Sequence, residues 1–121
     1  MNLLEAQKTI SDLADHFKIY PPSLRWKRRR NPIDTRSWYY VSKHVISLDI
    51  SATLSTLLHE FAHALQDSRG DSQGHGPAFR QALLDVVTYY YKGDIDKYPW
   101  KWDYASIYLF YKRLKELQRL D

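Results

Sequence analysis

Apolar residues repeat at the spacing of an α-helix in four stretches of the chain, residues 2–17, 51–68, 77–91 and 104–120. In each stretch one stripe is apolar and polar residues occupy the other side. The pair Pro21 and Pro22 follows the first stretch and favours extended backbone. We therefore predict four amphipathic helices, each with one face in a common core.

Three further stretches, residues 24–30, 37–41 and 44–50, alternate with the period of a β-strand. In the last of them the residues predicted to face the core are Ile46, Leu48 and Ile50. The residues between them, predicted to face outward, are Val45, Ser47 and Asp49. Together the elements predict an α+β fold, with a small three-stranded, mainly antiparallel sheet packed with about four helices.

The composition favours a single soluble domain. The 121 residues are 44% hydrophobic and 15% aromatic, enough for one modest core, so we expect one domain over residues 1–121. The apolar runs are too short to span a bilayer, and the N-terminal residues are amphipathic rather than typical of a signal peptide. With no cysteine present, we expect a cytoplasmic protein without a membrane partner, in the host cytoplasm if a phage encodes the chain.

The formal charge of +4 is concentrated between residues 25 and 43. Charged strands are common on exposed surfaces, so we favour the interpretation that these basic residues lie on a solvent-exposed outer face of the sheet. The alternative is a DNA-binding face, in which cations contact phosphates and aromatic rings stack on unpaired bases. The cations would be Arg25, Lys27, Arg28, Arg29 and Arg30, and the rings would be those of Trp26, Trp38, Tyr39 and Tyr40.

The strongest chemical pattern is His59-Glu60-Phe61-Ala62-His63, in the second predicted helix. His59 and His63 would lie one turn apart on one face, where both imidazoles can bind one metal ion. Imidazole nitrogens suit zinc, and three protein ligands leave a position for water, whose pKa the metal lowers to about 7. Glu60 can take a proton from that water and pass it to a leaving amine. The alternative interpretation is a helix with two solvated histidines that bind nothing.

The third metal ligand must come from outside this motif. His75 is the best candidate, because glycines flank it and Pro77 suits the first turn of a new helix. Asp67 and Asp71 compete with it, as ligands or as partners of the ligands, in a segment where aspartate is also ordinary turn chemistry. His16 and His44 lie at no ligand spacing, and we expect surface or hydrogen-bonded structural roles for them.

The motif, together with Gly74-His75-Gly76-Pro77-Ala78-Phe79, resembles the SprT-like zinc metallopeptidases, including small phage and bacterial members of that type. The resemblance covers about residues 53–87. It implies a zincin-like or minigluzincin-like fold, one Zn²⁺ ion held by His59, His63 and His75, and Glu60 as the general base. The broader group includes proteases that act on proteins bound or crosslinked to DNA. Because the chain has no cysteine, it cannot carry the cysteine-ligated zinc ribbon of longer members.

The resemblance predicts a zinc-dependent endopeptidase with a protein or peptide substrate. In the family, a strand edge near the metal helix pairs with extended substrate, and our candidate for that edge is residues 44–49. A nucleic-acid-binding module with a structural or vestigial zinc site is one alternative, and a hydrolase of a non-protein amide is another. A hydrolase also needs a donor for the developing oxyanion. The candidates are Tyr89, Tyr90, Tyr91, Tyr104, Tyr108 and Arg80.

Overall fold

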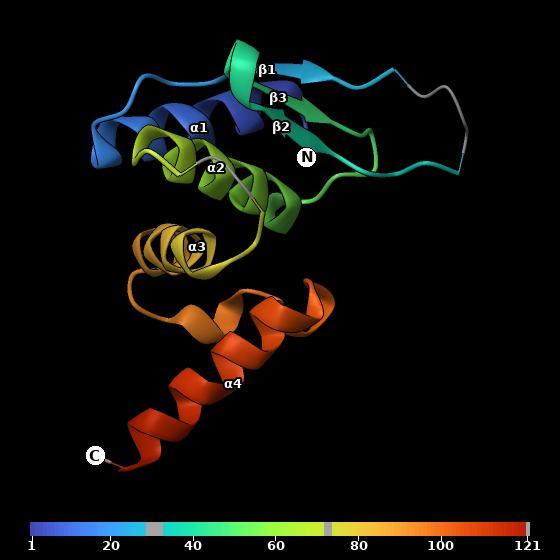
Figure 1. The fold of residues 1–121 in the computed structure, drawn as a ribbon. Helices are drawn as coiled ribbons and strands as arrows, with labels where there is room; N and C mark the ends of the chain where they lie inside the picture. Colours follow the sequence, from blue (N-terminus) through green and yellow to red (C-terminus); the bar gives the residue numbers. More distant parts are fainter. Residues whose placement is uncertain (29–32, 72–73, 121) are drawn as a thin grey trace.

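The computed structural model describes residues 1–28, 33–71 and 74–120, and it has the predicted α+β fold (Figure 1). The helices are α1 Leu3–Phe17, α2 Leu54–Ser68, α3 Pro77–Tyr90 and α4 Ala105–Leu120. The strands are β1 Ser23–Trp26, β2 Trp38–Tyr40 and β3 Val45–Leu48. Short 3₁₀ turns occur at Val41–Lys43, Ile95–Lys97 and Trp100–Trp102. Among the described residues no helix is long and apolar enough to cross a membrane.

The sheet is mixed, with strand order β1-β3-β2. Strand β3 is antiparallel to β2, as expected, but parallel to β1, and Ile46 lies opposite both Leu24 and Tyr39. The chain leaves β1, forms the far edge strand β2, and then returns through a 3₁₀ turn into the central position. Because β3 is paired on both sides, the prediction that residues 44–49 offer a free edge to substrate is wrong.

The strands are shorter than predicted, and this changes which side chains are buried. Ile46 and Leu48 are buried as predicted, but Ile50 is 69% exposed, whereas Ser47 and Asp49 are buried. Strand β3 ends at Leu48, so the alternation stops there. The chain then turns, with the Asp49 carboxylate accepting a hydrogen bond from the backbone N–H of Ser51 at 3.0 Å.

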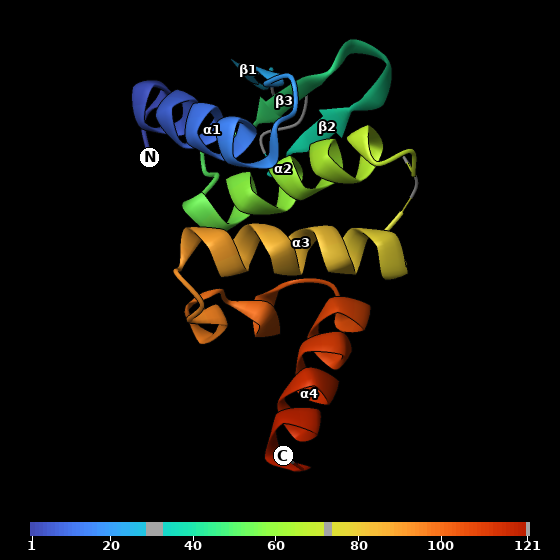
Figure 2. The same ribbon diagram turned by 90° about the vertical axis from the view of Figure 1, so that its left-hand side faces the viewer.

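Helix α2 lies between the sheet and α3 (Figures 1 and 2). Because α2 is covered on two sides, the small residues that lie between its large apolar residues are buried as well. Phe61 on α2 and Phe79 on α3 are among the largest fully buried side chains. The apolar stripe predicted for α2 is buried at Leu57, Leu58, Phe61 and Leu65, and α1 adds Ala6, Ile10 and Leu13 to the same core.

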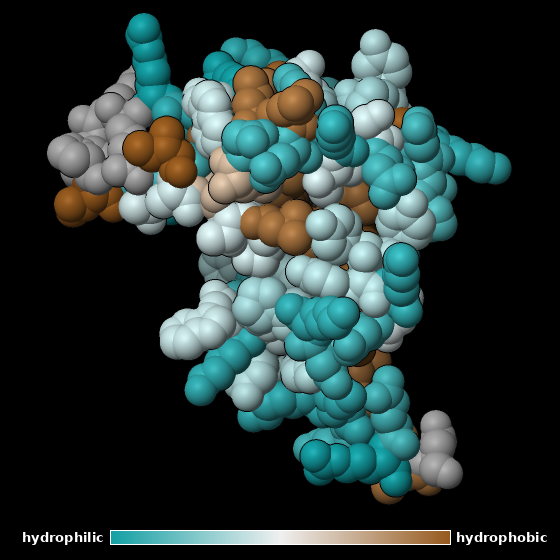
Figure 3. All heavy atoms as spheres, turned by 180° about the vertical axis from the view of Figure 1, so that it is seen from behind, coloured by the Kyte–Doolittle hydropathy of each residue, from teal (hydrophilic) through white to brown (hydrophobic). Residues whose placement is uncertain are grey.

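Helix α4 projects from the body of the molecule (Figures 1 and 2). Its first turns pack on the 3₁₀ turn before it, where the ring of Tyr111 stacks on that of Trp100 at 5.1 Å. Ile107 is buried, but Leu117 is 61% exposed because the helix extends beyond the core. The projecting part is largely hydrophilic when viewed from behind (Figure 3).

Lys27 turns inward at the end of β1 instead of facing solvent. Its ammonium group donates to the carbonyl oxygen of Asp34 at 2.9 Å and to that of Arg36. The same nitrogen lies 3.5 Å from Asp34 Oδ1 and 3.7 Å from Oδ1 of the fully buried Asp49. Lys27 therefore joins the segment that enters β2 to the end of β3.

We predict that Lys27→Met lowers the free energy of unfolding by about 3 kcal/mol, because it removes the ammonium group that pairs with the buried Asp49 carboxylate. Urea denaturation of the two proteins measures the difference. Lys115→Met is the matched control, because Lys115 also pairs with an aspartate, Asp96, but at the surface. Equal effects of the two substitutions would contradict a structural role for Lys27.

Candidate metal centre

Three histidines converge at one point. The Nε2 atom of His75 lies 3.2 Å from Nε2 of His59 and 3.2 Å from Nε2 of His63. The three candidate ligand atoms all lie within 4.8 Å of one another, so the group can hold one metal ion. These are the three residues that the sequence predicted as metal ligands.

The local fold explains this convergence. His59 and His63 stand one turn apart on α2, and His75 approaches from the segment just before α3. That segment turns at Gly74, whose φ of +68° is a conformation that glycine adopts without strain. Phe79, in the first turn of α3, contacts all three imidazoles, at centroid distances of 4.9 Å to His59, 4.2 Å to His63 and 4.9 Å to His75. Packing of α3 on α2 therefore sets the spacing of the ligands.

Hydrogen bonds on the far side of two rings orient them toward this point. Nδ1 of His59 lies 2.9 Å from the Asp103 carboxylate, and Nδ1 of His63 lies 3.1 Å from Oε1 of Gln66. Both partners are acceptors, so each Nδ1 donates to its partner and each Nε2 faces the common point. Burial lowers the pKa of His63 to about 4 and also lowers the pKa of His75, so both rings are neutral at pH 7.

The spacing of the nitrogens fits a metal ion. In a tetrahedral zinc site, with Zn–N bonds of 2.0–2.1 Å, ligand nitrogens are about 3.3 Å apart, close to the two distances from Nε2 of His75. A donor set of three imidazoles is also one that zinc accepts.

Neither of the two competing aspartates belongs to the three-histidine group. Asp67 accepts a hydrogen bond from the hydroxyl of Tyr39 at 2.9 Å, and Asp71 lies 3.4 Å from the amide nitrogen of Gln66. His44 is also held away from the centre, with Nδ1 bonded to the Tyr39 hydroxyl at 2.7 Å. Of the described residues, only His59, His63 and His75 form a group that could hold a metal.

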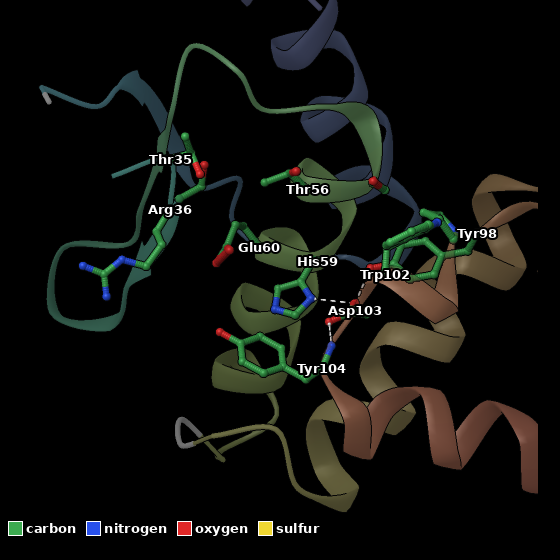
Figure 4. A pocket seen from close by; sticks show the side chains of 12 residues that line it. Thr35, Arg36, Thr56, His59, Glu60, Tyr98, Trp102, Asp103 and Tyr104 are labelled. Atoms are coloured by element: carbon green, nitrogen blue, oxygen red, sulfur yellow. Dashed lines mark hydrogen bonds and ion pairs between the residues drawn. The ribbon is translucent and has the colours of Figure 1, made fainter. Parts of the chain in front are cut away.

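Glu60 lies in a cleft of about 240 Å³ beside His59 (Figure 4). The residue is only 7% exposed. Burial raises the pKa of its carboxyl group to about 7, against the opposing effect of His59. The cleft is lined by Thr35, Arg36, Ser37, Ser55, Thr56, His59, Glu60, Tyr98, Pro99, Trp102, Asp103 and Tyr104.

Asp103 has a role that the sequence analysis missed. One of its carboxylate oxygens accepts a hydrogen bond from the backbone N–H of Tyr104, just before α4, at 2.7 Å. The other oxygen accepts from His59 and from the hydroxyl of Tyr98, at 2.9 and 2.5 Å. Burial opposes ionisation of Asp103, but the hydrogen bonds outweigh it and lower its pKa. No spacing in the sequence connects Asp103 to His59, whereas Gln66 is one helical turn from His63 and could have been found.

The basic residues of the alternative, DNA-binding interpretation are only partly available. Arg25 and Arg28 are exposed beside a hollow on the sheet that Trp26 also lines, and the Arg25 guanidinium lies 5.3 Å from the ring of Tyr40. Lys27 borders the same hollow but is engaged in the contacts described above. Arg29 and Arg30 lie outside the described residues.

No family model matches the chain, and no curated protein or solved structure shows significant similarity to it. The resemblance to SprT-like metallopeptidases therefore depends on the motif residues alone.

We predict that Asp103→Asn weakens zinc binding roughly tenfold to a hundredfold, because a neutral amide supports the His59 imidazole less than a carboxylate does. Competition with a chromophoric chelator measures the affinity. Asp96→Asn is the matched control, since Asp96 also accepts from a tyrosine hydroxyl, that of Tyr111, but away from the histidines. An affinity that Asp103→Asn leaves unchanged would show that the carboxylate does not support the ligand.

Proposed function

We propose that this protein is a zinc-dependent endopeptidase. The observation that carries the proposal is the placement of Glu60 in a cleft that His59 also lines, together with the convergence of the Nε2 atoms of His59, His63 and His75. Three protein ligands leave a coordination position for water or substrate, which is typical of catalytic rather than structural zinc sites. The SprT-like motif residues support the same conclusion.

The histidines, Glu60 and Asp103 have different roles in the proposed hydrolysis. A zinc ion bound by the histidines would lower the pKa of water and polarise the substrate carbonyl. Glu60 takes a proton from the attacking water and later delivers it to the amine that leaves. Its burial in the cleft excludes bulk water, which strengthens its interaction with charge that develops nearby. Asp103 holds His59 in the tautomer that presents Nε2 to the metal.

Strand β2 is suited to bind an extended substrate. Among the described strands it pairs with β3 alone, so its other edge carries no strand. Residues 35–37, which lead into β2, form one wall of the cleft. The backbone of Tyr39 also makes a hydrogen bond to Glu60, so this edge lies beside the proposed base. A peptide added along β2 would pass the cleft and be held mainly by backbone hydrogen bonds, with little sequence selectivity.

We predict that the zinc-loaded protein cleaves an unstructured basic DNA-binding protein, and that Glu60→Gln lowers kcat by roughly a hundredfold to ten thousandfold. Glutamine keeps the shape of the side chain but cannot take a proton. Cleavage is followed by mass spectrometry of the products, and the zinc content of both proteins is measured in parallel.

Zinc content should be unchanged in Glu60→Gln and reduced in His63→Ala. Glu116→Gln, on the exposed part of α4, is the control for a surface glutamate. Running the assay with and without single-stranded DNA shows whether Arg25 and Arg28 recruit substrate. Loss of zinc from Glu60→Gln, or cleavage that survives it, would contradict the assigned role of Glu60.

A further inference from the structure

We infer that Tyr104 is the hydrogen-bond donor that stabilises the oxyanion formed during peptide hydrolysis. This inference rests on the proposed function and adds a catalytic residue to it. A hydrolase gains much of its rate from a donor already placed where negative charge develops. Tyr104 lies at the start of α4, far from the zinc motif in the sequence, and no spacing marks it.

The aromatic ring of Tyr104 is fixed against the metal centre. It stacks on the His75 imidazole, with centroids 4.2 Å apart and an interplanar angle of 28°, and lies 5.9 Å from the ring of His59. Its backbone N–H donates to Asp103, the residue that also bonds His59. Two neighbouring residues at the start of α4 therefore hold two different ligands, and this limits movement of the ring.

The hydroxyl group of Tyr104 is available to a substrate. Tyr104 lines the same cleft as Glu60, and its hydroxyl end points away from Asp103, on the side where the Glu60 carboxylate lies (Figure 4). The residue is 58% exposed. Within residues 1–28, 33–71 and 74–120 the hydroxyl makes no hydrogen bond that would compete with a ligand. A carbonyl oxygen bound at the histidines would therefore meet a donor on one side and the base on another.

The other candidate donors lie elsewhere or are already engaged. Tyr89 donates to Asp12 on α1 at 3.0 Å. The Arg80 guanidinium lies over the ring of Phe110, and the Lys112 ammonium group lies over the ring of Tyr108. Neither candidate donor, Arg80 or Tyr108, lines the cleft. Tyr90 and Tyr91 are likewise absent from its lining.

Arg36 is a further competitor, because it also lines the cleft and carries a positive charge. Its guanidinium group bonds the carboxylate of Asp34 through Nε and Nη2, at 3.0 and 3.1 Å. It also lies 4.6 Å from the ring of Trp38. Arg36 is therefore held by its own neighbours, whereas the Tyr104 hydroxyl is not.

The proposed reaction adds one water molecule across the peptide bond. The water oxygen bonds to the carbonyl carbon as Glu60 takes a water proton, and the π electron pair moves to the carbonyl oxygen. The Tyr104 O–H group donates a hydrogen bond to that oxygen and keeps its proton. When the C–N bond breaks, its electron pair goes to the nitrogen, which receives the proton from Glu60. The products are a carboxylic acid and an amine.

We predict that Tyr104→Phe lowers kcat roughly a hundredfold and leaves KM nearly unchanged, because only the hydroxyl is lost and it acts mainly in the transition state. Phenylalanine retains the ring that stacks on His75, so zinc affinity and Tm should match those of the wild type. Tyr108→Phe is the control, since it removes a hydroxyl one turn along the same helix and outside the cleft.

A second measurement does not require turnover. The zinc-loaded protein is titrated with a phosphinic pseudopeptide, whose tetrahedral oxygens resemble the reacting carbonyl. Tyr104→Phe should weaken its binding at least about tenfold. Tyr108→Phe should have no effect on this binding.

The outcomes separate this inference from the proposed function. If wild type cleaves peptides and Glu60→Gln does not, yet Tyr104→Phe is as active as wild type, the role of Tyr104 is overturned and the peptidase stands. A loss of kcat in Arg36→Gln without a loss in Tyr104→Phe would identify Arg36 as the donor and overturn the inference. If wild type neither cleaves peptides nor binds the pseudopeptide, both conclusions fail.

Discussion

The hydrogen bond between Asp103 and His59 is the contact on which the proposed site depends most. It joins α2 to the start of α4 across 44 residues of sequence. It sets the tautomer of one ligand and, through the next residue, places the ring of Tyr104 against a second ligand. The metal centre therefore draws on α2, the start of α3 and the start of α4, and no single segment contains it.

The position of α2 gives the site its electrostatic character. Because this helix lies between the sheet and α3, even its polar residues Glu60 and Gln66 are buried. Burial raises the pKa of Glu60 and lowers that of His63, so both shifts favour the neutral form of the group. A cation held by the imidazoles would reverse this preference for the Glu60 carboxylate, because an opposite charge favours ionisation. The acidity of Glu60 is therefore coupled to occupation of the site.

Local periodicity predicted the parts of the molecule that depend on neighbours in sequence. The four helices, the buried stripe of α2 and the pairing of His59 with His63 follow from the helical period, and Gly74 with Pro77 marked where His75 would enter. The parallel pairing of β1 could not be predicted, because it depends on which side of β3 the intervening chain passes. Asp103 could not be predicted either, since its role depends on how α4 packs.

The basic segment shows how sequence can overstate surface charge. Lys27 and Arg36 contribute to the cationic run, but the structure pairs them with Asp34, and Lys27 also with Asp49. Those pairs hold residues 34–37, of which residues 35–37 form a wall of the cleft beside Glu60. Part of the positive charge therefore supports this wall of the cleft. Among the residues of this segment that the structure describes, the exposed cations left to attract a polyanion are Arg25, Arg28 and Lys43.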